Sequence, residues 1–117
     1  GVDGTGRGLG NLEKDFFLLV ESVMDPIEDL AVVMVDADRY CSTFSARPKK
    51  SLQEKLDEIR HQERAAGVAE EQLKRKAFET LTDPVSVFRM FRLAENIGAI
   101  ARHAAVAGDL MRSMIHV

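Results

Sequence analysis

Four carboxylate side chains on the first predicted helix have the spacing of a metal site. Glu21 and Asp25 lie four residues apart, as do Asp25 and Asp29, and Glu28 completes the group. Residues four apart are neighbours on a helix surface, and clustered carboxylate oxygens bind hard divalent cations. The alternative is a solvated acidic surface that is stabilised near a helix start at Pro26. We keep these four residues as candidate ligands of a divalent metal and expect no other cofactor.

A second charged surface lies on the last predicted helix and is mainly basic. It carries Arg89, Arg92, Arg102 and His103, with Glu95 among them. The simplest interpretation is a solvated cationic helix surface. The functional interpretation is a docking surface, because a cationic surface attracts an acidic protein partner. These five residues are therefore the candidate partner-binding site.

The sequence gives little support for catalysis. Cys41 occupies a core-spaced position, where a thiol usually fills space. Glu58 and His61 have the Glu-x-x-His spacing of carboxylate-bridged di-iron bundles, but the sequence has no second such pair. His61 is also predicted to point away from the core. We expect a protein that is not an enzyme.

Two further carboxylates interrupt the apolar stripe of the middle helix. Counted from Leu52, Glu63 and Glu70 fall inside this stripe, and burying an unpaired carboxylate is costly. Either the stripe drifts towards Ala65, Ala69 and Leu73, or the two carboxylates face a basic partner or a metal. We favour the drift and leave the alternative open.

Three long amphipathic segments, over about 12–45, 51–80 and 84–115, must position these groups. They predict an all-α, antiparallel up-down bundle of three helices that forms a single domain over residues 12–117. No stretch has the alternating pattern of a strand. The glycine-rich residues 1–11 lack periodicity and indicate a flexible linker or a remnant of an expression vector.

Local signals suggest where these helices bend, start and stop. Pro26 either kinks or breaks the first helix, and the continuous apolar phase across it favours a kink. Ser51 and Glu54 have the form of a capping box that starts the second helix, and Asp83-Pro84 starts the third. The apolar stripe of the first helix is read as Leu12, Phe16, Leu19, Val23, Ile27, Leu30, Met34, Ala37, Cys41 and Phe44.

Gly98 is the most unusual residue of the last helix. Glycine in a helix interior costs roughly 1 kcal/mol relative to alanine, so the absence of a side chain must be favoured by something else. We expect a close approach of a neighbouring helix along a row of small residues. This row consists of Ala94, Gly98, Ala101, Ala104 and Gly108.

Composition restricts the classes of partner and compartment. The 117 residues form one domain at most, and their net charge of −3 argues against nucleic-acid binding. No apolar run approaches the roughly 18 residues of a membrane span, so we expect no direct membrane insertion. The single cysteine excludes an internal disulfide and suits the reducing cytoplasm.

The chain resembles a PhoU domain in its last predicted helix. Glu95–Gly98 matches the start of the consensus Glu-x-Ile-Gly-Asp, and it follows the entry Asp83–Pro84 and the run Phe88–Leu93. Proteins of this family are three-helix bundles that regulate phosphate uptake and signalling. The resemblance extends over about residues 12–115, and its specific part is the short motif.

The resemblance implies a non-enzymatic regulatory domain that docks on a phosphate or other ion transporter, or on its signalling partner. It also implies a homodimer, because a full PhoU protein carries two such bundles and C₂ pairing is common. Such a domain would be cytoplasmic or attached to the membrane through the transporter. Two alternatives are a helical adaptor or assembly module unrelated to phosphate, and a metal-binding helical bundle.

The sequence departs from the family at its metal-binding positions. In the family, acidic residues four apart bind metal clusters on the bundle surface. Here Ala99 stands four residues after Glu95, and Gly67 stands four residues after Glu63. Both pairs have lost a ligand, so the acidic residues of the first helix are the better candidates for a metal.

Overall fold

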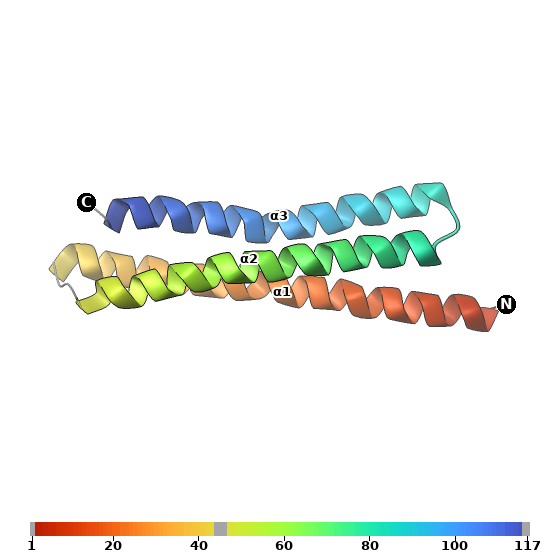
Figure 1. Ribbon diagram of the computed structural model, residues 1–117, viewed down its shortest axis with the longest axis horizontal. Coiled ribbons are helices and arrows are strands. Elements are labelled where there is room, and N and C mark those ends of the chain that lie inside the picture. Colours follow the sequence, from red (N-terminus) through yellow and green to blue (C-terminus); the bar gives the residue numbers. More distant parts are fainter. Residues whose placement is uncertain (1, 44–46, 116–117) are drawn as a thin grey trace.

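The computed structural model is a rod of three long helices that run up, down and up (Figure 1). The helices are α1 over Val2–Thr43, α2 over Arg47–Thr80 and α3 over Pro84–Ile115. The structure describes the backbone of residues 2–43 and 47–115, and the side chains of residues 10–40 and 50–115. These ranges contain no strand, so the predicted all-α three-helix bundle is confirmed. The rod measures 65 × 20 × 16 Å.

Helix α1 runs through Pro26 without interruption, so a break at this residue is wrong, whereas a kink there stays a prediction. Proline in a helix interior removes a hydrogen bond and costs about 3 kcal/mol. Its ring is fully buried in the bundle, and this apolar burial offsets part of the cost. The helix also begins at Val2, so residues 2–11 are helical rather than the predicted linker. Once packing has nucleated the turns after Leu12, each further residue adds to the helix at little cost.

The core positions of α1 follow a strict repeat of seven residues. Buried or half-buried side chains alternate in steps of four and three: Leu12, Phe16, Leu19, Val23, Pro26, Leu30, Val33, Ala37 and Tyr40. The sequence interpretation placed Ile27 and Met34 in this row, and this is wrong because they are 44% and 59% exposed. A period of 3.5 residues, as in coiled coils, selects Pro26 and Val33 instead.

The same repeat continues in α2 and α3. In α2 the row is Leu52, Leu56, Ile59, Glu63, Ala66, Glu70, Leu73 and Ala77. In α3 the fully buried members are Ala94, Gly98, Ala101, Ala105, Gly108 and Ile115, with Ala104 beside them. The small residues expected to let α3 approach its neighbours are thus all buried, and that expectation is confirmed. Gly108 packs closely against α2, since an added Cβ would lie 3.3 Å from Leu56 Cδ2.

The turn between α2 and α3 is formed by the Asp83-Pro84 signal. The Asp83 carboxylate accepts hydrogen bonds from the backbone N–H groups of Val85, at 3.4 Å, and Ser86, at 3.2 Å. The Ser86 hydroxyl donates a further hydrogen bond to it, at 2.9 Å. These contacts satisfy donors that the first turn of a helix leaves unpaired, so the predicted start of α3 at Pro84 is confirmed.

The start of α2 differs from the prediction. The helix begins at Arg47, so residues 47–50, predicted as a connector, lie in its first turn. Ser51 therefore lies inside the helix, and its predicted role in a capping box is wrong. Proline at the second helical position explains the early start, because it needs no hydrogen-bond acceptor there.

Membrane-spanning character is not found in this bundle. In the described parts of the chain, every helix is too polar over any long stretch to cross a bilayer.

Candidate partner-binding surface

The basic residues predicted on α3 do not form one free surface. All five residues are exposed, and Arg102 and Glu95 also form contacts with other parts of the bundle. Partner binding by these five residues stays a prediction, and two of them also have partners inside the bundle. Their contacts centre on a buried carboxylate of α2.

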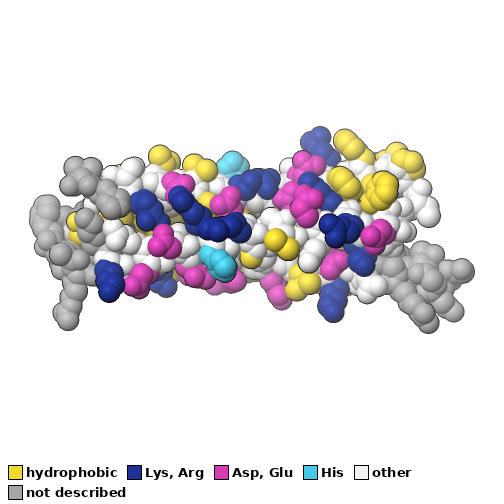
Figure 2. Space-filling view, in the orientation of Figure 1, with side chains coloured by type: hydrophobic (Ala, Val, Ile, Leu, Met, Phe, Trp, Pro, Cys, Tyr) yellow, Lys and Arg dark blue, Asp and Glu magenta, His cyan; other side chains and the backbone are white. Residues whose placement is uncertain are grey.

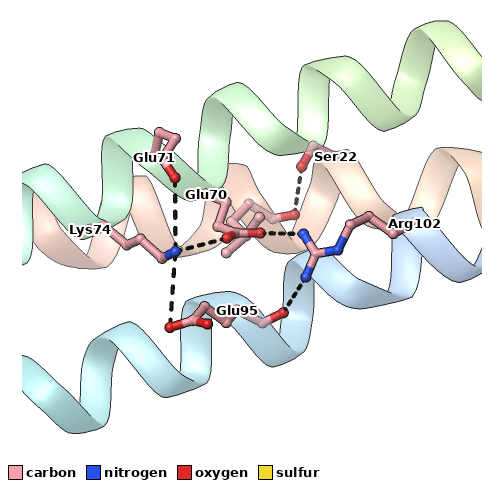
Figure 3. Close-up of polar contacts among 7 residues, drawn as sticks. Ser22, Glu70, Glu71, Lys74, Glu95 and Arg102 are labelled. Atoms are coloured by element: carbon pink, nitrogen blue, oxygen red, sulfur yellow. Dashed lines mark hydrogen bonds and ion pairs between the residues drawn. The ribbon is translucent and has the colours of Figure 1, made fainter.

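Glu70 is the buried polar residue at the centre of these contacts, with only 6% of its surface exposed. Arg102 Nη1 donates a hydrogen bond to Glu70 Oε1 at 2.9 Å, and Lys74 Nζ lies 3.0 Å from Oε2 (Figure 3). Arg102 Nη2 also donates to the backbone oxygen of Glu95 at 3.0 Å. Lys74 Nζ reaches Glu95 Oε1 at 4.0 Å. Two cations from two helices thus neutralise one buried anion.

The electrostatics of this cluster favour the ionised carboxylate. Burial acts to raise the pKa of Glu70, but the hydrogen bonds from Arg102 and Lys74 outweigh it and hold this pKa below its ordinary value. Burial likewise acts to lower the pKa of Lys74, and the bond to Glu70 raises it above its ordinary value. The cluster is therefore charged at neutral pH and is a structural feature of the α2–α3 contact.

The prediction that the apolar stripe of α2 drifts away from Glu70 is wrong. The alternative prediction, that Glu70 faces a basic group, is confirmed. The stripe does not drift, because Ala66, Leu73 and Glu70 itself are all buried in the same row. Gly98 supplies the space: a Cβ added there would lie 1.8 Å from Glu70 Oε1 and 2.9 Å from Glu70 Cδ. The missing side chain of Gly98 therefore accommodates a carboxylate from α2. Glu63, one repeat earlier, is half-buried.

Arg89 and Arg92 lie at one end of the rod, beside a group of exposed aromatic residues. Phe78 is 73% exposed, Phe88 is 62% exposed and Val85 is 54% exposed. Figure 2 shows hydrophobic side chains gathered at the end of the rod near the α2–α3 turn, whereas charged side chains of both signs cover much of the remaining face. We call Phe78, Val85 and Phe88 the aromatic tip.

The aromatic tip borders an apolar hollow. Its volume is about 450 Å³, and it is lined by Phe78, Leu81, Thr82, Pro84, Val87, Phe88 and Phe91. The Arg92 guanidinium lies 5.9 Å from the centre of the Phe88 ring, a distance at which a cation is attracted to the ring face. Neither Arg89 nor Arg92 has an ion-pair partner among the described residues. The end of the rod therefore presents exposed aromatic rings next to unpaired positive charge.

Sequence reasoning found the two arginines and missed the aromatic tip. The sequence feature that would have revealed the aromatic tip is the strict seven-residue repeat. Phe78 directly follows the core residue Ala77, and Phe88 follows the half-buried Val87. The seven-residue repeat places both rings outside the core rows. Large aromatic residues that are exposed near a turn call for a functional explanation.

The predicted metal ligands are not assembled. Glu21, Asp25 and Glu28 are exposed around a shallow depression on the outer side of α1. Asp29 faces α2 instead, where Gln62 Nε2 donates a hydrogen bond to its Oδ2 at 2.8 Å. Over the part of the chain that the structure describes, no group of three or more His, Cys, Asp or Glu side chains could hold a metal ion. The four carboxylates do not converge, because Asp29 faces away from the other three, and metal binding by them stays a prediction.

The other residues singled out in the sequence are either exposed or outside the described part of the molecule. His61 is exposed, as predicted, so the Glu58–His61 pair does not face the core. The side chains of Cys41 and Phe44, and residue His116, lie outside the described part of the molecule. The chain matches no protein-family model, curated protein or solved structure.

Proposed function

We propose that this bundle is a non-enzymatic interaction domain that binds a protein partner through its aromatic tip. The observation that carries the proposal is the exposure of Phe78 and Phe88, at 73% and 62%, around an apolar hollow. Exposed apolar patches mark interaction sites, and aromatic and arginine side chains supply most of the energy where proteins bind. A partner that fits this end presents an apolar side chain to the hollow and acidic groups to Arg89 and Arg92.

The resemblance to PhoU domains supports a more specific form of this proposal. In this form the partner is the cytoplasmic part of a phosphate or other ion transporter, or its signalling protein, and the domain regulates uptake. The motif that carries the resemblance, Glu95–Gly98, lies on α3, the helix that also bears Phe88, Arg89 and Arg92. A domain of this kind would work in the cytoplasm next to the membrane.

Site-specific photo-crosslinking in the native cell tests the proposal. A photo-reactive residue in place of Phe88 is expected to crosslink a transporter subunit or its signalling protein, identified by mass spectrometry. The matched control carries the same residue in place of Val68, which is 60% exposed on α2, away from the tip. Phe78→Asp in the chain that carries the photo-reactive residue at position 88 is expected to weaken the crosslink. The double substitution Phe78→Asp and Phe88→Asp in the otherwise unmodified chain is expected to alter phosphate uptake. Equal crosslinking from positions 88 and 68 would contradict tip-mediated docking.

A helical adaptor unrelated to phosphate is the second candidate. It is favoured by a second apolar hollow of about 500 Å³ between α1 and α3, at the other end of the rod. A tip-dependent crosslink to a protein that is neither a transporter nor its regulator would support this alternative. This result would keep the proposed binding role of the aromatic tip and would reject the PhoU-like role in phosphate uptake.

A further inference from the structure

Helices α1 and α3 each carry a second apolar row, and the bundle leaves many of its side chains exposed. On α1 this outer row follows the same alternation of three and four residues: Phe17, Val20, Met24, Ile27, Ala31 and Met34. On α3 the exposed members of the outer row are Leu93, Ile100 and Met114, with Leu110 beside them, and the half-buried members are Ile97, Ala107 and Met111. Ala104, at the remaining position of this row, is buried. A second heptad row on a helix is the pattern of a second coiled-coil-like contact. Of the described residues of α2, only Val68 and Phe78 are large, apolar and exposed.

Near Met34 and Met114 the two outer rows border the same groove. Met34 of α1 and Leu110, Met111 and Met114 of α3 line one apolar hollow of about 500 Å³. These side chains are well exposed, with Met34 at 59%, Leu110 at 63% and Met114 at 71%. The groove between α1 and α3 therefore lacks the helices that would cover it in a larger bundle.

The exposed area of this groove matches what a dimer needs. Its eight most exposed large side chains, at 41–71% exposure, are Phe17, Met24, Ile27, Met34, Leu93, Ile100, Leu110 and Met114. Side chains of this size present roughly 150–200 Å² each when fully exposed, so together they present several hundred Å². That is close to the ~800 Å² that one partner contributes to a stable interface.

Charge complementarity identifies the occupant as a second copy of this chain. Met34 and Leu110 lie level with each other across the shared hollow. Counting back three heptads from each of them places the exposed residues Glu13 and Arg89 level with one another. An acidic group thus lies on the α1 side of the groove and a basic group lies at the same height on the α3 side.

We infer that two copies pair groove to groove, with α1 of one copy packed against α3 of the other and their helices parallel. A twofold axis along the rod brings Glu13 of each copy to the height of Arg89 of its partner. It likewise brings the exposed Glu28 near the height of the exposed His103. The antiparallel alternative would place α1 against α1 and bring acidic residues together. This pairing shares Arg89 with the proposed docking site but uses none of the aromatic tip, and it does not depend on the proposed docking function.

Sedimentation equilibrium of the full chain tests this inference. We expect a dimer at micromolar concentrations, and we expect Met34→Glu with Leu110→Glu to raise its dissociation constant about 100-fold, because charges replace buried apolar contacts. Phe17→Glu, at the other end of the groove, is a second variant with the same expected direction. Val68→Glu introduces the same charge on α2 and is expected to leave the dimer intact. Thermal unfolding of each variant establishes that it is folded.

Charge reversal tests the arrangement within the dimer. Glu13→Arg alone and Arg89→Glu alone are each expected to weaken the dimer about three- to fivefold, as for exposed ion pairs. The two substitutions together are expected to restore it. A wild-type monomer at all concentrations, or a dimer insensitive to the groove variants, would overturn the inference. Absence of restoration in the double variant would overturn the parallel pairing of α1 with α3.

Discussion

Glu70 and Gly98 are matched across the α2–α3 contact. The carboxylate is buried at a core position, and the glycine leaves the space that it occupies. Arg102 and Lys74 supply the opposite charge. A buried carboxylate without these partners would strongly destabilise the fold, so the side chains must be considered as one unit.

Gly98→Ala is expected to destabilise the bundle by about 1–3 kcal/mol. The new Cβ would collide with the Glu70 carboxylate, and the cost of disrupting a buried ion pair exceeds the roughly 1 kcal/mol that alanine gains over glycine in a helix. The free energy of unfolding in urea measures the effect. The matched control is Gly67→Ala, where nothing lies within 4 Å of the new Cβ. This control is expected to stabilise the protein by about 0.5–1 kcal/mol.

A double-mutant cycle separates the collision from other effects of the alanine. In a Glu70→Ala background the carboxylate is absent, so Gly98→Ala is expected to become stabilising. If alanine at 98 remained equally destabilising in that background, the space requirement of Glu70 would not be the reason for the glycine.

Helices α2 and α3 are joined by a turn whose cap is formed by one side chain. The hydrogen bond from the Ser86 hydroxyl to the Asp83 carboxylate, with those from the backbone, holds the pKa of Asp83 below its ordinary value. The carboxylate is therefore ionised at neutral pH and interacts favourably with the N-terminal end of α3.

Asp83→Ala is expected to lower the melting temperature by several degrees, because the backbone N–H groups of Val85 and Ser86 lose their acceptor. Asp83→Asn keeps an acceptor but loses the charge, so it is expected to have an intermediate effect. Differential scanning calorimetry at neutral pH measures both variants. Equal melting temperatures for the alanine and asparagine variants would show that the cap bond contributes nothing.

The number and order of the helices followed from the sequence, because apolar periodicity and the Asp83-Pro84 signal are local features. The core row of α1 was predicted correctly at Leu12, Phe16, Leu19, Val23, Leu30 and Ala37, and wrongly at Ile27 and Met34, which stand in place of Pro26 and Val33. After Val23 and again after Leu30 the prediction exchanged the order of a three-residue and a four-residue step, whereas packing in a long bundle keeps one alternation throughout. The same error hid the outer row, since Ile27 and Met34 were assigned to the core.

The candidate site was less predictable than the fold. Arg102 and Glu95 were found by their charge, but their partner Glu70 comes from another helix, at a distance in sequence that periodicity does not reveal. Sequence spacing along one helix also grouped Asp29 with three carboxylates that point elsewhere. Which charges are free and which are paired depends on contacts between helices.

The whole molecule has a charged α2 and two apolar surfaces that are separate from each other. The aromatic tip lies at the α2–α3 turn, and the groove between α1 and α3 is deepest towards the opposite end. On the polar side of the rod, ion pairs join α2 to α3, for example Arg112 to Asp57 at 2.7 Å. Two apolar surfaces would allow the chain to pair with itself and still bind another protein.

Global stability is expected to fall in acid through Glu70. Its pKa in the folded protein is below the ordinary value of 4.5, so its ion pairs contribute fully above about pH 4.5 and are lost as the pH falls through the folded pKa. The urea midpoint should therefore decrease between pH 6 and pH 3. In Glu70→Gln the midpoint should be lower at neutral pH and should change less with acid. An unchanged pH dependence in this variant would contradict the role of the buried carboxylate.

The buried carboxylate also determines how far α3 can slide along α2. Both helices repeat every seven residues and α3 is rich in alanine, so a shift by one repeat would keep most apolar rows in contact. Such a shift moves α3 by about 10 Å and brings Ala105 or Phe91 opposite Glu70 in place of Gly98. Neither residue leaves room for the carboxylate, and Arg102 would move beyond its reach. A single glycine thus selects one alignment among several that hydrophobic packing alone would accept.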